Sequence, residues 1–256
     1  MKKMIALAMA MTMGLSLVAC GSSDTAASTD TAAETTEAAD TADTAEETEV
    51  PSAGGSYTIG ICQLVQHEAL DAATQGFKDA IVEALGEDAV TFDEQNAQGD
   101  SNTCATIING FVAEDADLIL ANATAALQAA QAGTSEIPIL GTSVTEYGVA
   151  LGIDDFDGTV GGNISGTSDL APLTEQAAML NELFPDAKNV GLLYCTAEAN
   201  SQYQVDEVQK ALEGMGYTCK QYGFSDSNDL SSVTTTAADE SDVIYVPTDN
   251  TVANNT

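Results

Sequence analysis

The chain has 256 residues, with 40 acidic side chains against six lysines and no arginine, which gives a formal net charge of −34 at pH 7. Binding of phosphate groups needs clustered Lys and Arg side chains, so this charge excludes nucleic acid and anionic membrane surfaces as partners. The acidic excess indicates a soluble exported protein and carries no information about the fold.

The first 20 residues have the pattern of a secretory signal. A basic start is followed by an apolar stretch over 4–18, which is shorter than a membrane-spanning helix requires. The motif LVAC at 17–20 is similar to a bacterial lipobox, in which cleavage leaves Cys20 as a lipid-carrying N-terminus. The alternative is an ordinary signal peptide with an incidental cysteine. We expect a lipoprotein signal peptide over 1–20, with Cys20 anchoring the protein to the outer face of the cytoplasmic membrane.

Residues 21–56 form a segment of different composition. They are mainly Ala, Thr, Ser, Asp and Glu, with almost no large apolar side chain. Such a segment cannot bury enough apolar surface to offset the entropy cost of ordering. We therefore expect a disordered acidic tether over 21–56.

Four further cysteines, Cys62, Cys104, Cys195 and Cys219, lie in apolar or amphipathic stretches. No CxxC pair occurs, so their spacing indicates neither a zinc site nor thioredoxin-type chemistry. Free cysteine behaves as a small hydrophobic residue in such surroundings, and we expect buried thiols, with disulfides as the alternative.

From Tyr57 onward, short apolar runs with strand character alternate with helix-like segments. The first series has expected strands over 57–65, 90–95, 117–122 and 137–144. Between the first two strands, one helical face collects Ala73, Phe77, Ala80, Ile81, Ala84 and Leu85, and Gly86 is placed to end the helix. The next helical face collects Cys104, Ile107, Ile108 and Phe111.

A glycine-rich stretch over 154–169 separates this series from a second one. Pro172 suits the first turn of a helix that runs to about Phe184. Further strands are expected over 189–195, 217–224 and 242–249, with helices near 201–213 and 228–239.

Repeated strand–helix–strand order predicts an α/β protein in which parallel sheets are covered by helices on both faces. Two such series predict an N-terminal lobe over 57–165 and a C-terminal lobe over 166–256, joined by the glycine-rich crossing. The chain stops where another helix should begin, so we expect the second lobe to be incomplete through C-terminal truncation.

Open parallel sheets bind ligands at the carboxyl ends of their strands, where helix N-termini present free N–H groups. The polar residues at these ends in the first series are Gln63, Gln66, His67, Asn122, Thr124, Thr142 and Ser143. Those in the second series are Thr196, Glu198, Asn200, Ser201, Thr248, Asp249 and Asn250.

Four stretches carry a resemblance to a known family: GICQLVQHEALDAATQGF at 60–77, GTSV at 141–144, GGNISGTSDLAPLTEQ at 161–176 and DVIYVPTDNTVA at 242–253. They resemble the ABC-transporter substrate-binding lipoproteins of the tryptophan/tyrosine-binding type, a branch of the two-lobed type I periplasmic-binding-protein fold. The resemblance runs from Tyr57 to the last residue.

The resemblance implies capture of a small amino-acid-like solute between the lobes, lobe closure, and delivery to an ABC permease with its ATPase subunits. It implies no cofactor, no metal and no catalytic residue. A zwitterionic solute needs one site for its carboxylate and another for its ammonium group. Helix N-termini with Thr142, Ser143, Thr167 and Ser168 suit the carboxylate, because the chain has no arginine to clamp it.

Asp169 or Asp249 suits the ammonium group, and an aromatic ring would need an apolar wall, for which Leu64, Tyr147 and Tyr194 are candidates. His67 either contacts the ligand or is a helix-start histidine satisfied by local backbone. Asp249 is either the ammonium partner or the cap of a helix that begins beside it.

Other function classes have weaker support. A sugar or nucleoside receptor of an importer is the alternative among binding proteins, and an extracytoplasmic enzyme or adhesin on the same fold is the alternative outside them. Cys62 lies inside a predicted strand, which disfavours a thiol–imidazole pair with His67. The glycines at 158–166 do not follow a strand in the GxGxxG spacing of dinucleotide sites. The acidic stretch at 154–157 lacks the twelfth-position Glu of a calcium loop.

Overall fold

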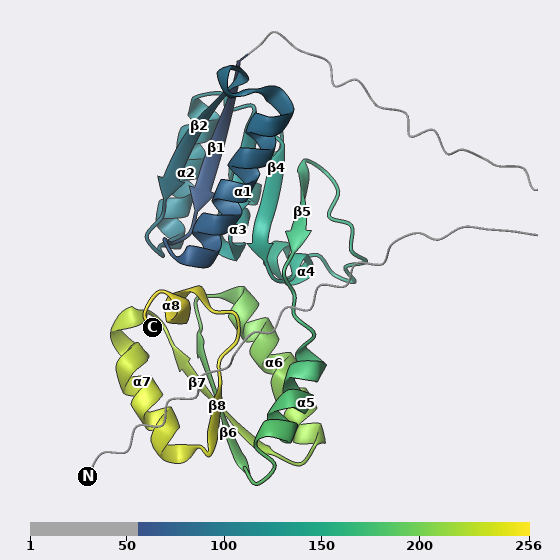
Figure 1. Ribbon diagram of the computed structural model, residues 1–256, viewed down its shortest axis with the longest axis vertical. Coiled ribbons are helices and arrows are strands. Elements are labelled where there is room, and N and C mark those ends of the chain that lie inside the picture. Colours follow the sequence, from purple (N-terminus) through teal and green to yellow (C-terminus); the bar gives the residue numbers. More distant parts are fainter. Residues whose placement is uncertain (1–55) are drawn as a thin grey trace, which may run out of the picture. The chain divides into compact units, whose positions relative to one another are not determined.

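The computed structural model describes residues 56–256 (Figure 1). The predicted signal peptide, the lipidation site Cys20 and nearly all of the predicted tether lie outside the described residues. Across residues 56–256, none of the helices combines the length and the apolar character needed to cross a membrane.

The first sheet has five parallel strands in the order β2 (Val90–Asn96), β1 (Tyr57–Gln63), β3 (Leu118–Asn122), β4 (Ile139–Val144) and β5 (Ile164–Ser168). Its helices are α1 (Glu68–Leu85), α2 (Ser101–Ala113), α3 (Thr124–Gly133) and α4 (Tyr147–Leu151), with a short 3-10 helix at Glu87–Ala89. All strand carboxyl ends therefore lie at one edge of the sheet.

Both faces of this sheet are covered, as predicted. Successive residues of β1 point to opposite faces, so Ile59 and Ile61 pack with Phe77 of α1, while Cys62 packs with α2 and α3. An added Cβ at Gly60 would come within 2.5 Å of the Phe111 ring, so glycine lets α2 approach the sheet closely.

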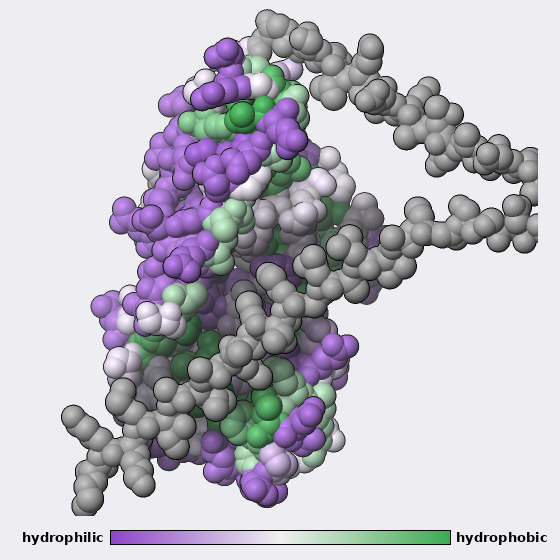
Figure 2. Space-filling model, in the orientation of Figure 1, coloured by the Kyte–Doolittle hydropathy of each residue, from purple (hydrophilic) through white to green (hydrophobic). Residues whose placement is uncertain are grey.

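The predicted helical faces are confirmed in α2 and only partly in α1. In α2, Cys104, Ile108 and Phe111 are buried. In α1, Leu70 and Thr74 are the buried residues, and the predicted Ala80, Ala84 and Leu85 are exposed. Hydrophilic side chains cover much of the surface over α1 and β2 on the face drawn in Figure 2. The contacts of α1 with the sheet thus extend to Phe77 and Ile81, and the end of the helix beyond them faces solvent.

The second sheet has three parallel strands in the order β7 (Thr218–Phe224), β6 (Asn189–Cys195) and β8 (Val243–Tyr245). One face packs against α5 (Leu173–Leu183) and α6 (Ala199–Gly214), and the other against α7 (Ser227–Glu240) and α8 (Asn250–Ala253). A helix of four residues, α8, begins at Asn250, where the sequence analysis expected another helix to begin.

The structure corrects the sequence analysis at the glycine-rich stretch. This stretch contains β5, which pairs with β4 as the fifth strand of the first sheet, so the predicted lobe boundary between 165 and 166 falls inside a strand. An added Cβ at Gly166 would overlap the Tyr147 hydroxyl and the Gly141 carbonyl. At position 166, glycine is therefore required by close packing.

Five of the seven predicted strands are longer than the observed ones, by one to five residues. The first ends at Gln63 instead of residue 65, and the last covers Val243–Tyr245 instead of 242–249. Pro247 cannot donate a ladder hydrogen bond, which helps to explain the early end of β8. Of the cysteines, Cys62, Cys104 and Cys195 are buried free thiols and Cys219 is a half-buried one.

Candidate functional site

Two cavities open where the loops after the two sets of strands face each other. The first, which we call the His67 cavity, has a volume of about 340 Å³. It is lined by His67, Ala69, Leu70, Ser143, Thr145 and Asp169 after the first sheet, and by Asn200, Val246, Pro247, Thr248, Asp249, Asn250, Val252 and Ala253 after the second. Seven of the predicted site residues thus meet here: His67, Ser143, Asp169, Asn200, Thr248, Asp249 and Asn250.

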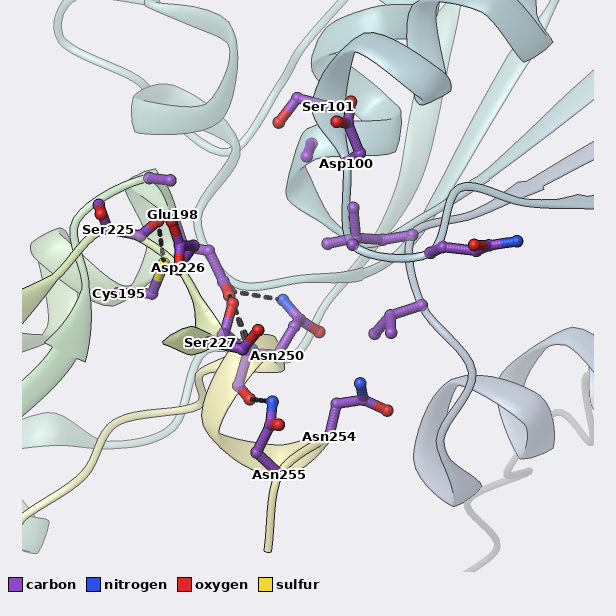
Figure 3. A pocket seen from close by; sticks show the side chains of 17 residues that line it. Asp100, Ser101, Cys195, Glu198, Ser225, Asp226, Ser227, Asn250, Asn254 and Asn255 are labelled. Carbon is purple, nitrogen blue, oxygen red and sulfur yellow. Dashed lines mark hydrogen bonds between the residues drawn. The ribbon is translucent and has the colours of Figure 1, made fainter. Parts of the chain in front are cut away.

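The second cavity, which we call the Glu198 cavity, has a volume of about 250 Å³ and is shown in Figure 3. Its polar wall includes Asp100, Glu198 and Asp226, and Leu64 and Val65 supply apolar surface. Asn250 lines both cavities, so the two share one wall.

His67 is the residue that immediately precedes α1. Its backbone is extended, with φ −156°, and its side chain makes no capping hydrogen bond. The Nε2 atom is buried and has no hydrogen-bond partner among residues 56–256. The local backbone therefore does not satisfy this imidazole, contrary to one of the two readings of the sequence. An uncapped helix start and an unpaired ring nitrogen together favour a hydrogen-bonding anion.

Asp169 and Ser143 lie on the same side of the His67 cavity. Asp169 follows β5 directly, and its carboxylate makes no hydrogen bond or ion pair with another described residue, although its backbone N–H donates to the Val144 carbonyl. Burial, followed by the Asp169 charge, raises the pKa of Tyr147 to about 12. Ser143 has a positive φ of 54°, an uncommon conformation for a non-glycine residue, at an irregularity in the β4–β5 register.

Both carboxylate oxygens of Asp249 accept hydrogen bonds from residues of its own lobe. Its carboxylate accepts hydrogen bonds from the backbone N–H of Val252 at 2.9 Å and of Cys195 at 2.7 Å. The first bond caps α8, so the capping role foreseen for Asp249 is present. Burial, followed by the nearby Glu198 charge, raises the pKa of Asp249. The ionised form of Asp249 is therefore held by backbone donors and not by a cation of the described chain.

Glu198 also binds the start of α8. Its carboxylate accepts from the backbone N–H and Nδ2 of Asn250 at 3.0 and 2.7 Å, and from the backbone N–H and Oγ1 of Thr251 at 2.9 and 2.8 Å. The first N–H groups of α8 are thus occupied by two carboxylates. This helix start is not available to a ligand carboxylate.

Several predicted site residues are structural. The buried amides of Gln63 and Asn122 bond to each other, to Thr74 and to the Leu70 carbonyl, which ties β1 and β3 to α1. Thr124 is buried at the start of α3. Ser168 donates to the Thr145 carbonyl at 2.7 Å, and Thr196 donates to the Phe224 carbonyl at 3.1 Å. Seven of the predicted site residues line neither of the two cavities: Gln63, Asn122, Thr124, Thr142, Thr167, Ser168 and Thr196.

The predicted apolar wall is only partly present. Leu64 lines the Glu198 cavity. Tyr147 is buried against the first sheet with its hydroxyl donating to the Thr167 carbonyl, and the Tyr194 hydroxyl bonds to Gln202 and Gln221. Both tyrosines therefore pack inside their lobes.

Sequence reasoning assigned no ligand role to Thr145, Val246 or Val252, and none to Glu198. The available signal for Glu198 was its place among the polar residues that follow the sixth strand. Its bonds to Asn250 and Thr251, more than 50 residues later, left no sequence signal. Within residues 56–256, no group of three or more His, Cys, Asp or Glu side chains is arranged to hold a metal ion.

Comparison with known proteins gives a consistent result. Residues 58–256 match the family described as ABC transporter substrate binding protein. A tyrosine-binding protein from Clostridioides difficile strain R20291 is 38% identical over 196 residues, which cover 76% of this chain and 56% of that protein. The chain thus spans about half the length of this curated relative.

Two solved structures are also similar. A domain from Streptococcus pneumoniae in complex with L-Trp is 32% identical, with a TM-score of 0.74 over 78% of this chain and 68% of that one. The ligand-free, open structure of a substrate-binding protein with adhesive properties from Clostridium difficile is 38% identical, with a TM-score of 0.54 over the same shares. The parallel sheets and these similarities confirm the predicted type I periplasmic-binding-protein fold. The chain belongs to the ABC transporter substrate binding protein family.

Proposed function

We propose that this protein is the solute-binding component of an ABC importer and that it captures an amino acid, aromatic or related, in the His67 cavity. The observation that carries the proposal is the pairing, in one cavity, of an unsatisfied imidazole at an uncapped helix start with a free carboxylate at Asp169. The names of the relatives, a tyrosine-binding protein and a domain in complex with L-Trp, support this solute class.

The two poles of a zwitterion match these two groups. The solute carboxylate binds the His67 imidazole and the first turn of α1, where the helix dipole favours negative charge. The solute ammonium binds Asp169, the carboxylate of this cavity that has no partner in the described chain. Asp249 already accepts two backbone hydrogen bonds, so we assign it to capping α8.

Closure of the lobes around the solute is part of the proposal. One relative is described as a ligand-free, open structure, which supports a solute site that opens and closes. We place the lobe boundary after Ser168, the last residue of β5.

A thermal-shift screen of the full-length protein tests the solute class. We expect L-tryptophan or L-tyrosine to raise the melting temperature, because a ligand at 100 times its dissociation constant stabilises the folded state by about 2.7 kcal/mol. Sugars and nucleosides serve as controls and should leave the melting temperature unchanged. A shift produced only by a sugar or a nucleoside would show that the solute is not an amino acid.

Membrane anchoring through Cys20 is a separate proposal. Proteins of this family act outside the cytoplasm, and the motif that ends at Cys20 supports a lipid anchor there. We expect Cys20→Ala to move the protein from the membrane fraction to the soluble fraction, since the acidic segment that follows has no affinity for anionic lipid. Unchanged fractionation of the variant would contradict the anchor.

A further inference from the structure

The wall shared by the two cavities is held in place by two buried carboxylates, Glu198 and Asp249. Glu198 is 8% exposed and Asp249 is 4% exposed, and the two carboxylates lie close enough for the Glu198 charge to raise the pKa of Asp249. The ion pairs of residues 56–256 join Lys78 to Glu94 and Lys220 to Glu240, and neither involves these two acids. Burial of two carboxylates without a cation is costly unless hydrogen bonds compensate for it. The hydrogen bonds that these two carboxylates accept come from the β6–α6 region and from the start of α8.

The bonds of Glu198 determine which way the Asn250 side chain faces. An ionised carboxylate can only accept hydrogen bonds, so the Asn250 amide must turn its Nδ2 toward Glu198, at 2.7 Å. Because the amide group is planar, its oxygen then points away from Glu198, as Figure 3 shows. This Oδ1 accepts no hydrogen bond from any side chain or backbone group in residues 56–256, and Asn250 lines both cavities.

We propose that Glu198 is a positioning residue of the solute site, which holds Asn250 with its amide oxygen toward the cavities. The inference rests on the proposed function, because it concerns the same site. With this orientation, the shared wall offers an acceptor to an N–H or O–H group of the solute. The Asn250 amide would otherwise be free to rotate and present either a donor or an acceptor.

The substitution Glu198→Gln tests this role. A glutamine side chain keeps the shape of Glu198 but replaces one acceptor oxygen with an amide donor, which meets either the donors of Asn250 or those of Thr251. In the first case the Asn250 amide turns over and presents Nδ2 to the cavities. For that arrangement we expect the affinity for L-tryptophan or L-tyrosine, measured by titration calorimetry on the full-length protein, to fall at least about tenfold. If the glutamine nitrogen meets Thr251 instead, Asn250 keeps its orientation and the Asn250→Ala variant decides the test.

Asp242→Asn is the matched control. The Asp242 carboxylate accepts from the backbone N–H groups of Lys188 and Asn189, both at 2.8 Å, at the opposite end of β6. The substitution Asp242→Asn makes the same change from carboxylate to amide beside the same sheet, at a residue that lines neither cavity. We expect this variant to bind within about twofold of wild type, and an equal loss in both variants would overturn the proposal.

A second variant keeps the test decisive if Glu198→Gln does not fold. Asn250→Ala leaves both backbone donors of α8 on Glu198 but removes the amide oxygen, so we expect a similar loss of affinity. In the double variant, the loss should not exceed that of the larger single variant, because both changes remove the same acceptor.

The outcomes separate the inference from the proposed function. Full affinity in Asn250→Ala, with binding intact in the wild type, overturns only the role of Glu198 and Asn250. Absence of binding of either amino acid by the wild-type protein overturns the proposed function and, with it, this inference.

Discussion

Replacement of Asp169 by asparagine is expected to weaken amino-acid binding by about 10- to 100-fold, which corresponds to about 1.4 to 2.7 kcal/mol. Asp169 lines the His67 cavity, and its exposed carboxylate has no hydrogen-bond partner in the described chain that a solute ammonium group would have to displace. A hydrogen bond to a charged group contributes about 1.5 to 3 kcal/mol, and asparagine keeps the shape of the side chain while removing its charge. Titration calorimetry with L-tryptophan or L-tyrosine measures the loss.

The control for this substitution is Asp154→Asn. Asp154 is an exposed residue that lines neither of the two cavities, and the substitution removes one negative charge just as Asp169→Asn does. Screening by salt limits the reach of such a charge to about 8–10 Å, so we expect nearly unchanged affinity. Equal binding by wild type and Asp169→Asn would remove Asp169 from the site and return Asp249 to consideration as the ammonium partner.

The largest effect on stability is expected for Phe111→Ala, at about 3–5 kcal/mol. Phe111 is 2% exposed, and its ring fills the space over Gly60 that a side chain on β1 would otherwise occupy. Removing the ring leaves a cavity between α2 and the first sheet that neither element can close without moving. The urea midpoint of the first sheet's unfolding transition should fall accordingly.

Phe184→Ala is the matched control for the stability prediction. This phenylalanine follows α5 and is 48% exposed, so its truncation leaves no closed cavity. We expect a change of about 1 kcal/mol or less. Similar losses in the two variants would mean that Phe111 does not hold α2 on the sheet as the structure indicates.

The periodic elements could be predicted because their signals are local. The β6 strand was predicted with its observed bounds, and the buried face of α2 follows directly from the spacing of Cys104, Ile108 and Phe111. These patterns depend on whether successive side chains share a face, which chain geometry sets within a few residues. The parallel order of the strands follows from the helices between them.

β5 and the C-terminal end of α1 were predicted less well, because their structure depends on contacts with elements distant in the sequence. β5 reads as a loop because its sequence, ISGTS, is short, small and polar, and its strand conformation depends on pairing with β4 and on contact with Tyr147. Ala84 and Leu85 were predicted to be buried but are exposed, because the contacts of α1 with the sheet end at about Ile81. Neither property is encoded in local periodicity.

The sequence by itself determined the class of fold, the family and the set of strand-end loops that line the two cavities, because alternating elements and short motifs are properties of neighbouring residues. Only the tertiary structure decided which polar residues of those loops face a cavity. The Gln63 amide bonds to Asp71 and Thr74, and the amide nitrogen of Asn122 bonds to Thr74 and to the Leu70 carbonyl. In contrast, His67 Nε2 and the Asp169 carboxylate, like the buried Oδ1 of Asn122, have no hydrogen-bond partner in the described chain. It also decided that Asp249 and Glu198 hold α8. Hydrogen bonds between residues far apart in the chain decide these roles, and the identity of a polar side chain does not reveal whether its partner is the protein or a solute.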